Sequence, residues 1–498
     1  MAHALLLPLD NRPCTSRFPL EIAAIAGFEV IVPPVSLLGD VKKPADLVGL
    51  ETWLEAQLAQ VPLVVISLDT WLYGGLVFSR KSTASVQQLT ERLQALVQLK
   101  SRFPQLRIAA FATLLRLSNH NDATEERPYW AELGEKIFRY AWLEDALSRQ
   151  ETPDPVLSTE FQALHSQIPC ECLSDYRELR QRNLNLLFQA LDAVQAEIFD
   201  YLYIGCDDSG EYGWNVQEKA QLAQAIDQKE LGSQVLLYPG ADELASALVI
   251  RALIPQPVPV ALAYTFPESC SLPTLYEGLP LEQTLQAQAQ AAGVLVSSEP
   301  QAQALLWLHN PPQLQFDQYL DRLSRQPLDS ADYLRLGNAL KASLLPVAVA
   351  DLCYANGGDQ GLLEAFESQG LLPLLKGYSA WNTTGNTLGF AFAWLKAWHH
   401  SQSEDLETGS LQTRFLLERL LDDGWYQGVM RQKLCQHYSD PVTLDSCLRL
   451  LAFCNERLQI WHELGTNWQA AEIRQLFFPW RRFFEVALAV CLKKATEK

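Results

Sequence analysis

The sequence predicts an α/β protein, a (β/α)8-like barrel with or without irregular closure, followed by a helical C-terminal region. Apolar segments typical of buried strands alternate with amphipathic helical patterns over the first 400 residues. These segments are apolar almost without interruption, as parallel strands are when both faces of their sheet are covered. About eight or nine strand–helix units favour a TIM barrel over the alternative, a doubly wound open parallel sheet.

The strand candidates follow one another along the chain at residues 4–9, 28–34, 62–68, 106–112, 199–205, 234–240, 258–264, 304–308 and 344–350. Between them, segments 83–103 and 178–198 have the clearest helical periodicity. Together these elements define a barrel-like catalytic domain over residues 1–400.

After residue 400 the pattern becomes mainly helical, at 411–434, 442–464 and 470–478. The polar stretch 399–410 marks the boundary, so that 401–498 forms a second region. Pro479 ends the last helical segment, and the stretch PWRRFFE then brings charged and aromatic residues together. This end either forms a solvated face or packs back on the core.

The composition excludes several classes of protein. Lys and Arg number 39 against 58 Asp and Glu, and this net charge of −19 argues against nucleic acid or an anionic membrane as a partner. No apolar stretch reaches the roughly 18 residues of a membrane span, and the N-terminus indicates a first strand instead of a signal peptide. The ten cysteines are scattered, which indicates reduced thiols and a cytoplasmic location. Cys206 and Cys353 are interpreted as small core residues.

Polar residues follow the strand candidates at once, and this regularity predicts a substrate site. The carboxyl ends of parallel strands lie at one edge of the fold, so side chains far apart in sequence are expected to converge there. The residues at these ends are Asp10, Asn11, Arg12, Asp69, Tyr73, Asp207, Asp208, Asp242, Glu243, Asn310 and Asp351. A single Asp or Asn at such a position is also explained as a helix N-cap, but the recurrence at six strand ends favours a site.

Asp207 and Asp208 are predicted to be the catalytic pair. Two neighbouring carboxylates cannot both ionise freely, so one keeps its proton near neutral pH and the pair supplies an acid and a base. Adjacent strand residues point to opposite faces, and Ser209-Gly210 provides the bend that would bring both to one ligand. The alternative is the capped start of a helix.

Two glycine-containing stretches add candidates for substrate binding. NGGD contributes Asn356 and Asp359, and SAWNTTGN contributes Trp381, Asn382 and Asn386. An indole beside amides suits a sugar ring, which stacks its C–H face on the aromatic and bonds its hydroxyls to the amides. Asn382 and Asn386 are expected on one face of the helix that begins here. An elaborate helix N-terminus is the alternative.

The same acidic residues allow a second chemistry. Carboxylates are ligands that Mg²⁺ or Mn²⁺ prefers, and Asp10, Asp69, Asp208, Asp242 and Glu243 are the candidates for such a site. The favoured expectation is that no metal or other cofactor is used. The sequence has no HExxH motif or Cys/His cluster to indicate zinc. A non-catalytic protein that binds a small polar ligand is the third interpretation.

Six stretches in order resemble a bacterial family known as domain of unknown function number 4127. They are LPLDNRP, SLDTWLYGGLVFSR, DDSGEYG, YPGADE, NGGD and WNTTGNTLG. The resemblance covers nearly the whole chain, PWRRFFE included, and the family name implies no activity.

A more distant likeness is to glycosidases of the O-GlcNAcase and hyaluronidase type, which are barrels with a double acid at one strand end. YIGCDDSG is similar to that element, which implies that Asp207 orients the acetamido group and that Asp208 is the general acid. LWLHNPP is similar to a second element and implies that Asn310 binds a sugar hydroxyl. The aspartate expected soon afterwards is matched only by Asp317. These observations predict a hydrolase of a sugar-containing or similarly polyhydroxylated small molecule.

Overall fold

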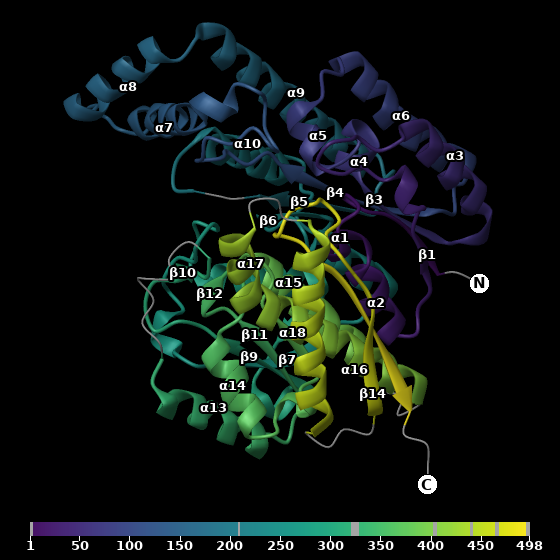
Figure 1. The fold of residues 1–498 in the computed structure, drawn as a ribbon. Coiled ribbons are helices and arrows are strands. Elements are labelled where there is room, and N and C mark those ends of the chain that lie inside the picture. The colour runs from purple at the N-terminus through teal and green to yellow at the C-terminus, as the bar shows by residue number, and fades with distance from the viewer. Residues whose placement is uncertain are drawn as a thin grey trace. The chain divides into compact units, whose positions relative to one another are not determined.

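The computed structural model describes residues 3–207, 210–319, 328–401, 406–438, 442–463 and 468–494. The chain forms two compact units, each made of several segments of the sequence (Figure 1). Unit 1 comprises Met1–Asn11, Val30–Leu248 and Tyr276–Gly278, and unit 2 comprises Arg12–Glu29, Val249–Leu275 and Leu279–Lys498.

Unit 1 is built on a six-stranded sheet with the strand order β2-β1-β3-β4-β5-β6, in which every pair is parallel. The strands are β1 (Ala4–Leu7), β2 (Val30–Ile31), β3 (Leu63–Ser67), β4 (Arg107–Leu114), β5 (Tyr201–Cys206) and β6 (Val235–Pro239). Their apolar side chains are buried on both faces, and Val64, Val65 and Ile66 are at most 1% exposed.

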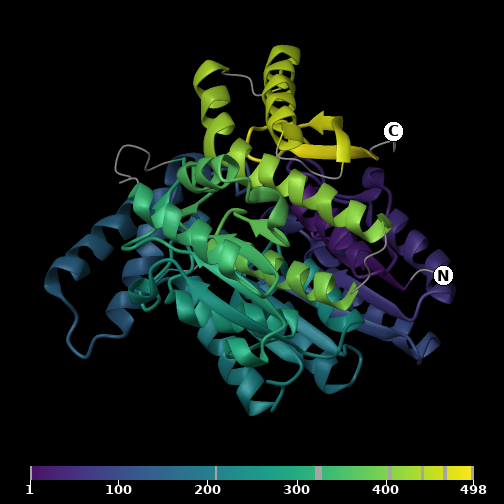
Figure 2. The same cartoon turned by 90° about the horizontal axis from the view of Figure 1, so that it is seen from below.

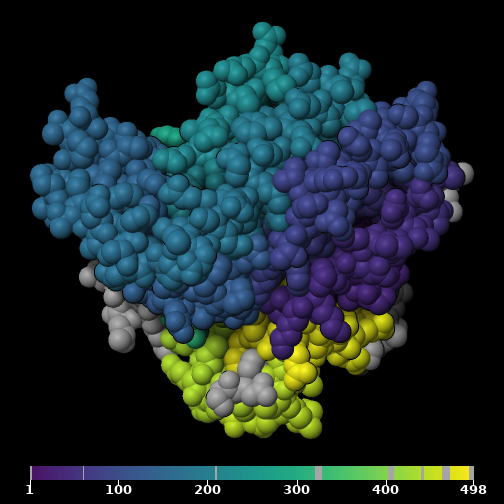
Figure 3. All heavy atoms as spheres, turned by 90° about the horizontal axis from the view of Figure 1, so that it is seen from above, coloured from purple at the N-terminus to yellow at the C-terminus, as the bar shows by residue number. Residues whose placement is uncertain are grey.

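The helices of unit 1 connect these strands. They are α3 (Leu47–Gln57), α4 (Leu68–Tyr73), α5 (Leu76–Lys81), α6 (Val86–Arg102), α7 (Trp130–Ser148), α8 (Pro155–Gln167), α9 (Cys170–Gln195) and α10 (Trp214–Gln228), while α11 (Leu244–Leu253) runs from unit 1 into unit 2. A capping box between Ser85 and Gln88 starts α6. Trp130 and Tyr176 lie in an apolar cluster between α7 and α9, and Figure 3 shows this blue part of unit 1 as a projecting lobe.

Unit 2 is built on a five-stranded parallel sheet with the order β13-β11-β9-β7-β8. Its strands are β7 (Val258–Tyr264), β8 (Val294–Val296), β9 (Ala304–His309), β11 (Val347–Asp351) and β13 (Gly377–Ser379), and a separate pair is formed by β10 (Phe316–Asp317) and β12 (Tyr354–Ala355). Its helices include α1 (Pro13–Ser16), α2 (Phe18–Ile25), α12 (Leu281–Ala292), α13 (Ser330–Ala342), α14 (Gln360–Ser368) and α15 (Thr384–Ser401).

Both sheets have the same order of connections. In unit 1, β1 is flanked by β2 on one side and β3 on the other, and in unit 2 β7 is flanked in the same way by β8 and β9. The direction in which strands are added therefore reverses beside β1 and beside β7. In open α/β sheets, ligands bind outside the carboxyl ends of the strands at such a reversal.

The predicted α/β class is confirmed, and each of the nine strand candidates contains a strand. The barrel is not confirmed, because the parallel strands of the described residues lie in two open sheets. The apolar pattern of a segment records that it is buried but not which segment it pairs with, and the pairing decides between one closed sheet and two open ones.

The C-terminal part of unit 2 combines helices with a hairpin. It contains α16 (Leu406–Arg419), the π-helix η6 (Leu420–Met430), α17 (Arg431–His437) and α18 (Leu444–Glu463), followed by the antiparallel strands β14 (Trp468–Phe477) and β15 (Ala487–Lys494). The hairpin lies beside α18 (Figure 2). The helix predicted at 470–478 is wrong, since this segment forms β14 and takes its hydrogen bonds from β15. The boundary predicted near residue 400 falls inside unit 2 and stays a prediction.

Candidate functional site

Asp69 occupies a buried position at the carboxyl edge of the unit 1 sheet. Strand β3 ends at Ser67, whose hydroxyl caps α4 by accepting a hydrogen bond from the Thr70 amide at 3.2 Å, and this places Asp69 in the first helical turn. Its carboxylate accepts hydrogen bonds from the amide and the hydroxyl of Thr113 at 2.8 and 2.9 Å. Burial raises the pKa of Asp69 to about 7, although the bonds from Thr113 and the charge of Arg80 oppose the rise.

The side chain of Asp69 borders a very small void. The void has a volume of about 10 Å³, close to the space that one water molecule needs, and Tyr73, Thr113 and Asn183 also line it. Tyr73 is 7% exposed, and the Arg182 guanidinium lies 5.5 Å from the centre of its ring. The predicted residues Asp69 and Tyr73 therefore do lie together.

Arg80 is the centre of a buried charge network that the sequence did not reveal. Its guanidinium donates to Asp207 at 2.6 Å and to Glu125 at 2.8 Å, and it lies 3.7 Å from Glu126. Arg116 donates to both glutamates, at 3.2 and 3.1 Å. Arg80 is 2% exposed, so these charge-assisted bonds are largely shielded from water.

This network changes the expectation for the catalytic pair. The sequence predicts a shared proton because two carboxylates are neighbours, whereas in the structure Asp207 forms an ion pair with Arg80, whose positive charge opposes that of the carboxylate. The positive charge of Arg80 offsets like-charge repulsion at Asp207, and the proton shared with Asp208 stays a prediction. Asp208 lies outside the described residues.

The other predicted residues of unit 1 also lie at strand ends. Asp10 is 2% exposed and Asn11 is half-buried, and the Asn11 amide donates to the Gly39 carbonyl at 3.3 Å. Asp242 is 3% exposed. Glu243, fully buried, folds back to accept a hydrogen bond from the Ala241 amide at 2.9 Å.

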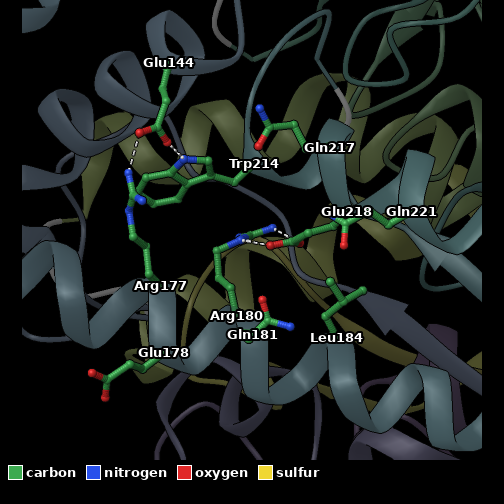
Figure 4. Close-up of a pocket in the computed structure, with 10 residues that line it drawn as sticks. All are labelled: Glu144, Arg177, Glu178, Arg180, Gln181, Leu184, Trp214, Gln217, Glu218 and Gln221. Carbon is green, nitrogen blue, oxygen red and sulfur yellow. Dashed lines mark hydrogen bonds and ion pairs between the residues drawn. The ribbon is translucent and has the colours of Figure 1, made fainter. Parts of the chain in front are cut away.

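A larger pocket of unit 1 contains none of the predicted residues (Figure 4). Its volume is about 360 Å³, and it is lined by Glu144, Arg177, Glu178, Arg180, Gln181, Leu184, Trp214, Gln217, Glu218 and Gln221. The side chains of Arg180 and Glu218 join through two hydrogen bonds of 2.7 and 2.6 Å, and Arg180 also donates to the Arg116 carbonyl at 2.9 Å. Arg180, in the wall of this pocket, thus holds the backbone of Arg116, which belongs to the charge network of Arg80.

In unit 2, Asp351 and Asp359 meet around His309. His309 ends β9, and its Nε2 lies 3.0 Å from Asp359 Oδ2, which also accepts a bond from the Tyr333 hydroxyl at 2.7 Å. The other carboxylate, Asp351, ends β11 and accepts from the Asp359 amide at 2.7 Å and from the Tyr378 hydroxyl at 2.8 Å. Burial raises the pKa of Asp351 to about 6, although the nearby His309 opposes the rise.

Gly358 of the NGGD stretch is required by the packing of the protein itself. A Cβ at Gly358 would overlap the Tyr378 hydroxyl and lie 3.1 Å from Asp351 Oδ2. The close approach that glycine permits is therefore made by side chains of the protein itself.

The amides of Asn310 and Asn356 bind other parts of the chain. Asn310 is fully buried, accepts from the Phe266 amide at 3.2 Å and donates to the Phe266 carbonyl at 2.7 Å and the Ser269 hydroxyl at 2.8 Å. This arrangement contradicts the expected bond to a sugar hydroxyl, because the amide is satisfied within the fold. Asn356 has a φ of +62° and donates to Asp317 at 2.6 Å.

Trp381 is not the open platform that was predicted. It is 3% exposed, and its ring packs edge-on against Phe18 at 6.3 Å and Phe484 at 6.0 Å between ring centres. Asn382 has a φ of +57° and precedes α15, so it does not share a helix face with the buried Asn386. Core packing explains this motif better than ring stacking of a sugar.

Arg12 contacts the distinctive C-terminal stretch of unit 2. Its guanidinium lies 4.8 Å from the ring centre of Trp480 and 4.0 Å from the Glu485 carboxylate. The nearby π-helix η6 contains Asp422 and Asp423, and both carboxylates pair with Arg419, at 3.2 and 2.5 Å. A π-helix is rare in proteins, and η6, with 11 residues, is longer than the single-turn π-bulges that are frequent at functional sites.

The residues missed in the sequence had weak signals. His309 stands at the end of a buried strand, next to Asn310, but the sequence has no Cys/His cluster around it that would indicate a site. Arg80 lies in SLDTWLYGGLVFSR, but its partners Glu125 and Glu126 are 45 and 46 positions away (125 − 80 and 126 − 80). Only the folded chain brings them together.

The open parallel sheets with acidic residues at their carboxyl edges define an α/β protein. A family model described as a protein of unknown function (DUF4127) matches residues 4–489, and the chain belongs to that family. No curated protein and no solved structure matches it. Within the part of the chain that the structure describes, no helix has the length and apolar character required to cross a bilayer.

Proposed function

We propose that the chain is a hydrolase of a sugar-containing or similarly polyhydroxylated small molecule, with its chemistry at the carboxyl edge of the unit 1 sheet. The observation that supports it is the placement of Asp69, a buried carboxyl at the end of β3, where the strand order reverses beside β1. Substrate binding and a cytoplasmic location, without nucleic acid or membrane as a partner, are part of this proposal.

Asp69 and Asp207, two of the carboxyl groups around Arg80, have different roles in the proposed reaction. Asp69 is poised to exchange a proton near neutral pH, and it acts as the general acid or base. Asp207 is held by the Arg80 guanidinium and acts as a fixed negative charge that stabilises a developing cation. Asp208, which the resemblance to glycosidases implies is the general acid, is the alternative to Asp69 as the proton donor.

The test is hydrolysis of a panel of chromogenic glycosides, N-acetylhexosaminides included. We expect Asp69→Asn to lower kcat at least about 100-fold, the usual contribution of general acid–base catalysis. Asp227→Asn, at an exposed position of α10, is the matched control and should keep wild-type turnover. The pH dependence of wild-type kcat/KM should show the titration of a group with a pKa near 7, and this titration should be absent in Asp69→Asn. Unchanged kcat in Asp69→Asn would refute the role of this residue.

The two alternatives give different results. Activity that is lost after dialysis against a chelator and restored by Mg²⁺ or Mn²⁺ would favour a metal-dependent hydrolase or transferase. Saturable binding of a sugar, with no turnover on the whole panel, would favour a non-catalytic binding protein.

A further inference from the structure

We propose that His309, Cys353 and Asp359 form a binding site for a zinc-type transition-metal ion in unit 2, separate from the proposed hydrolysis. One ligand atom of each residue, an imidazole nitrogen, the thiol sulfur and a carboxylate oxygen, lies within 4.8 Å of the other two. The residues are 44 and 6 positions apart (353 − 309 and 359 − 353), so no short motif in the sequence reveals them.

The fold brings the three residues to one place. His309 is the last residue of β9, Cys353 follows β11 by two positions, and Asp359 caps α14. Strands β9 and β11 are neighbours in the sheet, with Asp351 paired to His309 in register, so both carboxyl ends open at the same edge. The exposures of His309, Cys353 and Asp359 are 0, 3 and 4%.

The surroundings hold each donor in an orientation suited to a metal. His309 Nδ1 lies 3.1 Å from the Thr265 hydroxyl oxygen, which also accepts from the Trp307 indole at 3.1 Å. A hydroxyl oxygen has two lone pairs, so it can accept from Trp307 and from a protonated Nδ1, which leaves Nε2 for the metal. Metal-binding histidines are regularly fixed by such a partner on their second nitrogen.

Asp359 is fixed in a similar way. Its Oδ1 accepts from the Gly361 amide at 3.0 Å, and its Oδ2 accepts from the Tyr333 hydroxyl at 2.7 Å and faces His309 Nε2 at 3.0 Å. These bonds hold the carboxylate toward the imidazole, and a metal between the two requires only a small separation of the pair.

The donor set selects the class of ion. A thiolate with an imidazole and one carboxylate is suited to zinc and related transition metals, whereas Mg²⁺ and Mn²⁺ prefer oxygen donors. Three protein ligands leave the fourth tetrahedral position to another ligand, as in catalytic zinc sites.

Metal content of the wild-type protein is the first test. The full chain is produced in medium supplemented with zinc, and its metals are measured after gel filtration. We expect about one zinc ion per chain. Reconstitution with Co²⁺ should give the strong near-ultraviolet absorption of a thiolate–cobalt bond. A wild-type protein that holds less than about a tenth of an equivalent, with no such absorption, overturns the proposal; this outcome does not depend on any variant folding.

Variants then assign the ligands. Cys353→Ser should lose the thiolate–cobalt absorption and most of the zinc, whereas Cys454→Ser, which changes another buried cysteine of unit 2, should keep both. Thr265→Val removes the partner of His309 Nδ1 and should weaken zinc affinity about 10–100-fold while the cobalt absorption remains. Equal zinc content and cobalt absorption in Cys353→Ser and wild type would also overturn the proposal, since the same contacts would then be hydrogen bonds that only hold β9 to α14.

Discussion

Lys396 of α15 is a buried cation in unit 2. It is fully buried, and its ammonium donates to the carbonyls of Ala292 and Gly293 at 3.0 and 3.1 Å, at the C-terminal end of α12. This is the helix end at which a positive charge is favourable. Burial, and to a smaller extent the neighbouring charge of Arg251, nevertheless lower the pKa of Lys396 to about 7.

The lowered pKa of Lys396 makes stability depend on pH in a defined direction. The unfolded chain, with an ordinary lysine pKa of 10.5, binds one more proton than the folded chain between about pH 7 and 10.5. The free energy of unfolding should therefore rise with pH across this window, by up to about 1.4 kcal/mol per pH unit from this group. Urea denaturation at several pH values measures it. The rise of the unfolding free energy with pH should be smaller in Lys396→Met than in wild type. The control Lys433→Met, which changes an exposed lysine, should keep the wild-type rise. A wild-type rise in Lys396→Met would contradict the prediction.

Gly358 tests the packing around Asp351. An added methyl group overlaps the Tyr378 hydroxyl, and overpacking of this kind costs about 1–3 kcal/mol. We expect Gly358→Ala to destabilise the fold by that amount, and to cost less when Tyr378→Phe has removed the hydroxyl. Gly232→Ala, where no atom lies within 4 Å of the added carbon, is the control. Equal costs in the two backgrounds of Tyr378 would contradict this account.

At the scale of helices and strands, the apolar pattern of a segment predicted its secondary structure where burial alone decides it. Nine apolar segments were expected to be strands, and each contains one, because continuous burial leaves a direct record in the sequence. Strand β13 (Gly377–Ser379) lies outside the predicted segments, because its residues Gly-Tyr-Ser do not form an apolar run. Segment 470–478 was assigned to a helix because its apolar spacing fits both periods, and pairing with β15 decides the outcome.

The candidate site was predictable in position but not in partners. Asp69, Asp207 and Asp351 do lie at the carboxyl ends of strands, as the topology of parallel sheets requires. Trp381 and Asn310 could not be separated from core residues by their type, because a buried indole or amide looks the same in sequence as one that faces a ligand. Asp207 gained its partner Arg80 from 127 positions away (207 − 80).

Helix α2 packs within unit 2 although it precedes most of the chain. Phe18 is 1% exposed, lies 5.3 Å from Phe390 and 5.7 Å from Phe415 between ring centres, and has the Arg419 guanidinium 3.6 Å from its own ring centre. We expect Phe18→Ala to lower the free energy of unfolding by about 3–5 kcal/mol in urea denaturation. Phe477→Ala, at a position 42% exposed, should cost far less, and similar costs for the two variants would contradict the packing argument.

At the scale of the whole molecule, charge is the dominant feature. A net charge of −19 repels nucleic acid and anionic lipid, and we expect no binding to duplex DNA or to phosphatidylserine vesicles at about 0.15 M salt. Fluorescence anisotropy and vesicle sedimentation measure this, with a basic protein as the positive control. Saturable binding to either probe would show a local patch that overrides the net charge.

The dispersal of each unit over several stretches of sequence has a consequence for synthesis on the ribosome. Phe18 is translated 363 residues before Trp381 (381 − 18), an interval of roughly 20 to 70 seconds at ordinary elongation rates. Throughout that time the apolar face of α2 has emerged without its final neighbours. The nascent polypeptide therefore needs a chaperone, or a transient shelter of its own, to keep this early helix from aggregating before the last third of the message has been read.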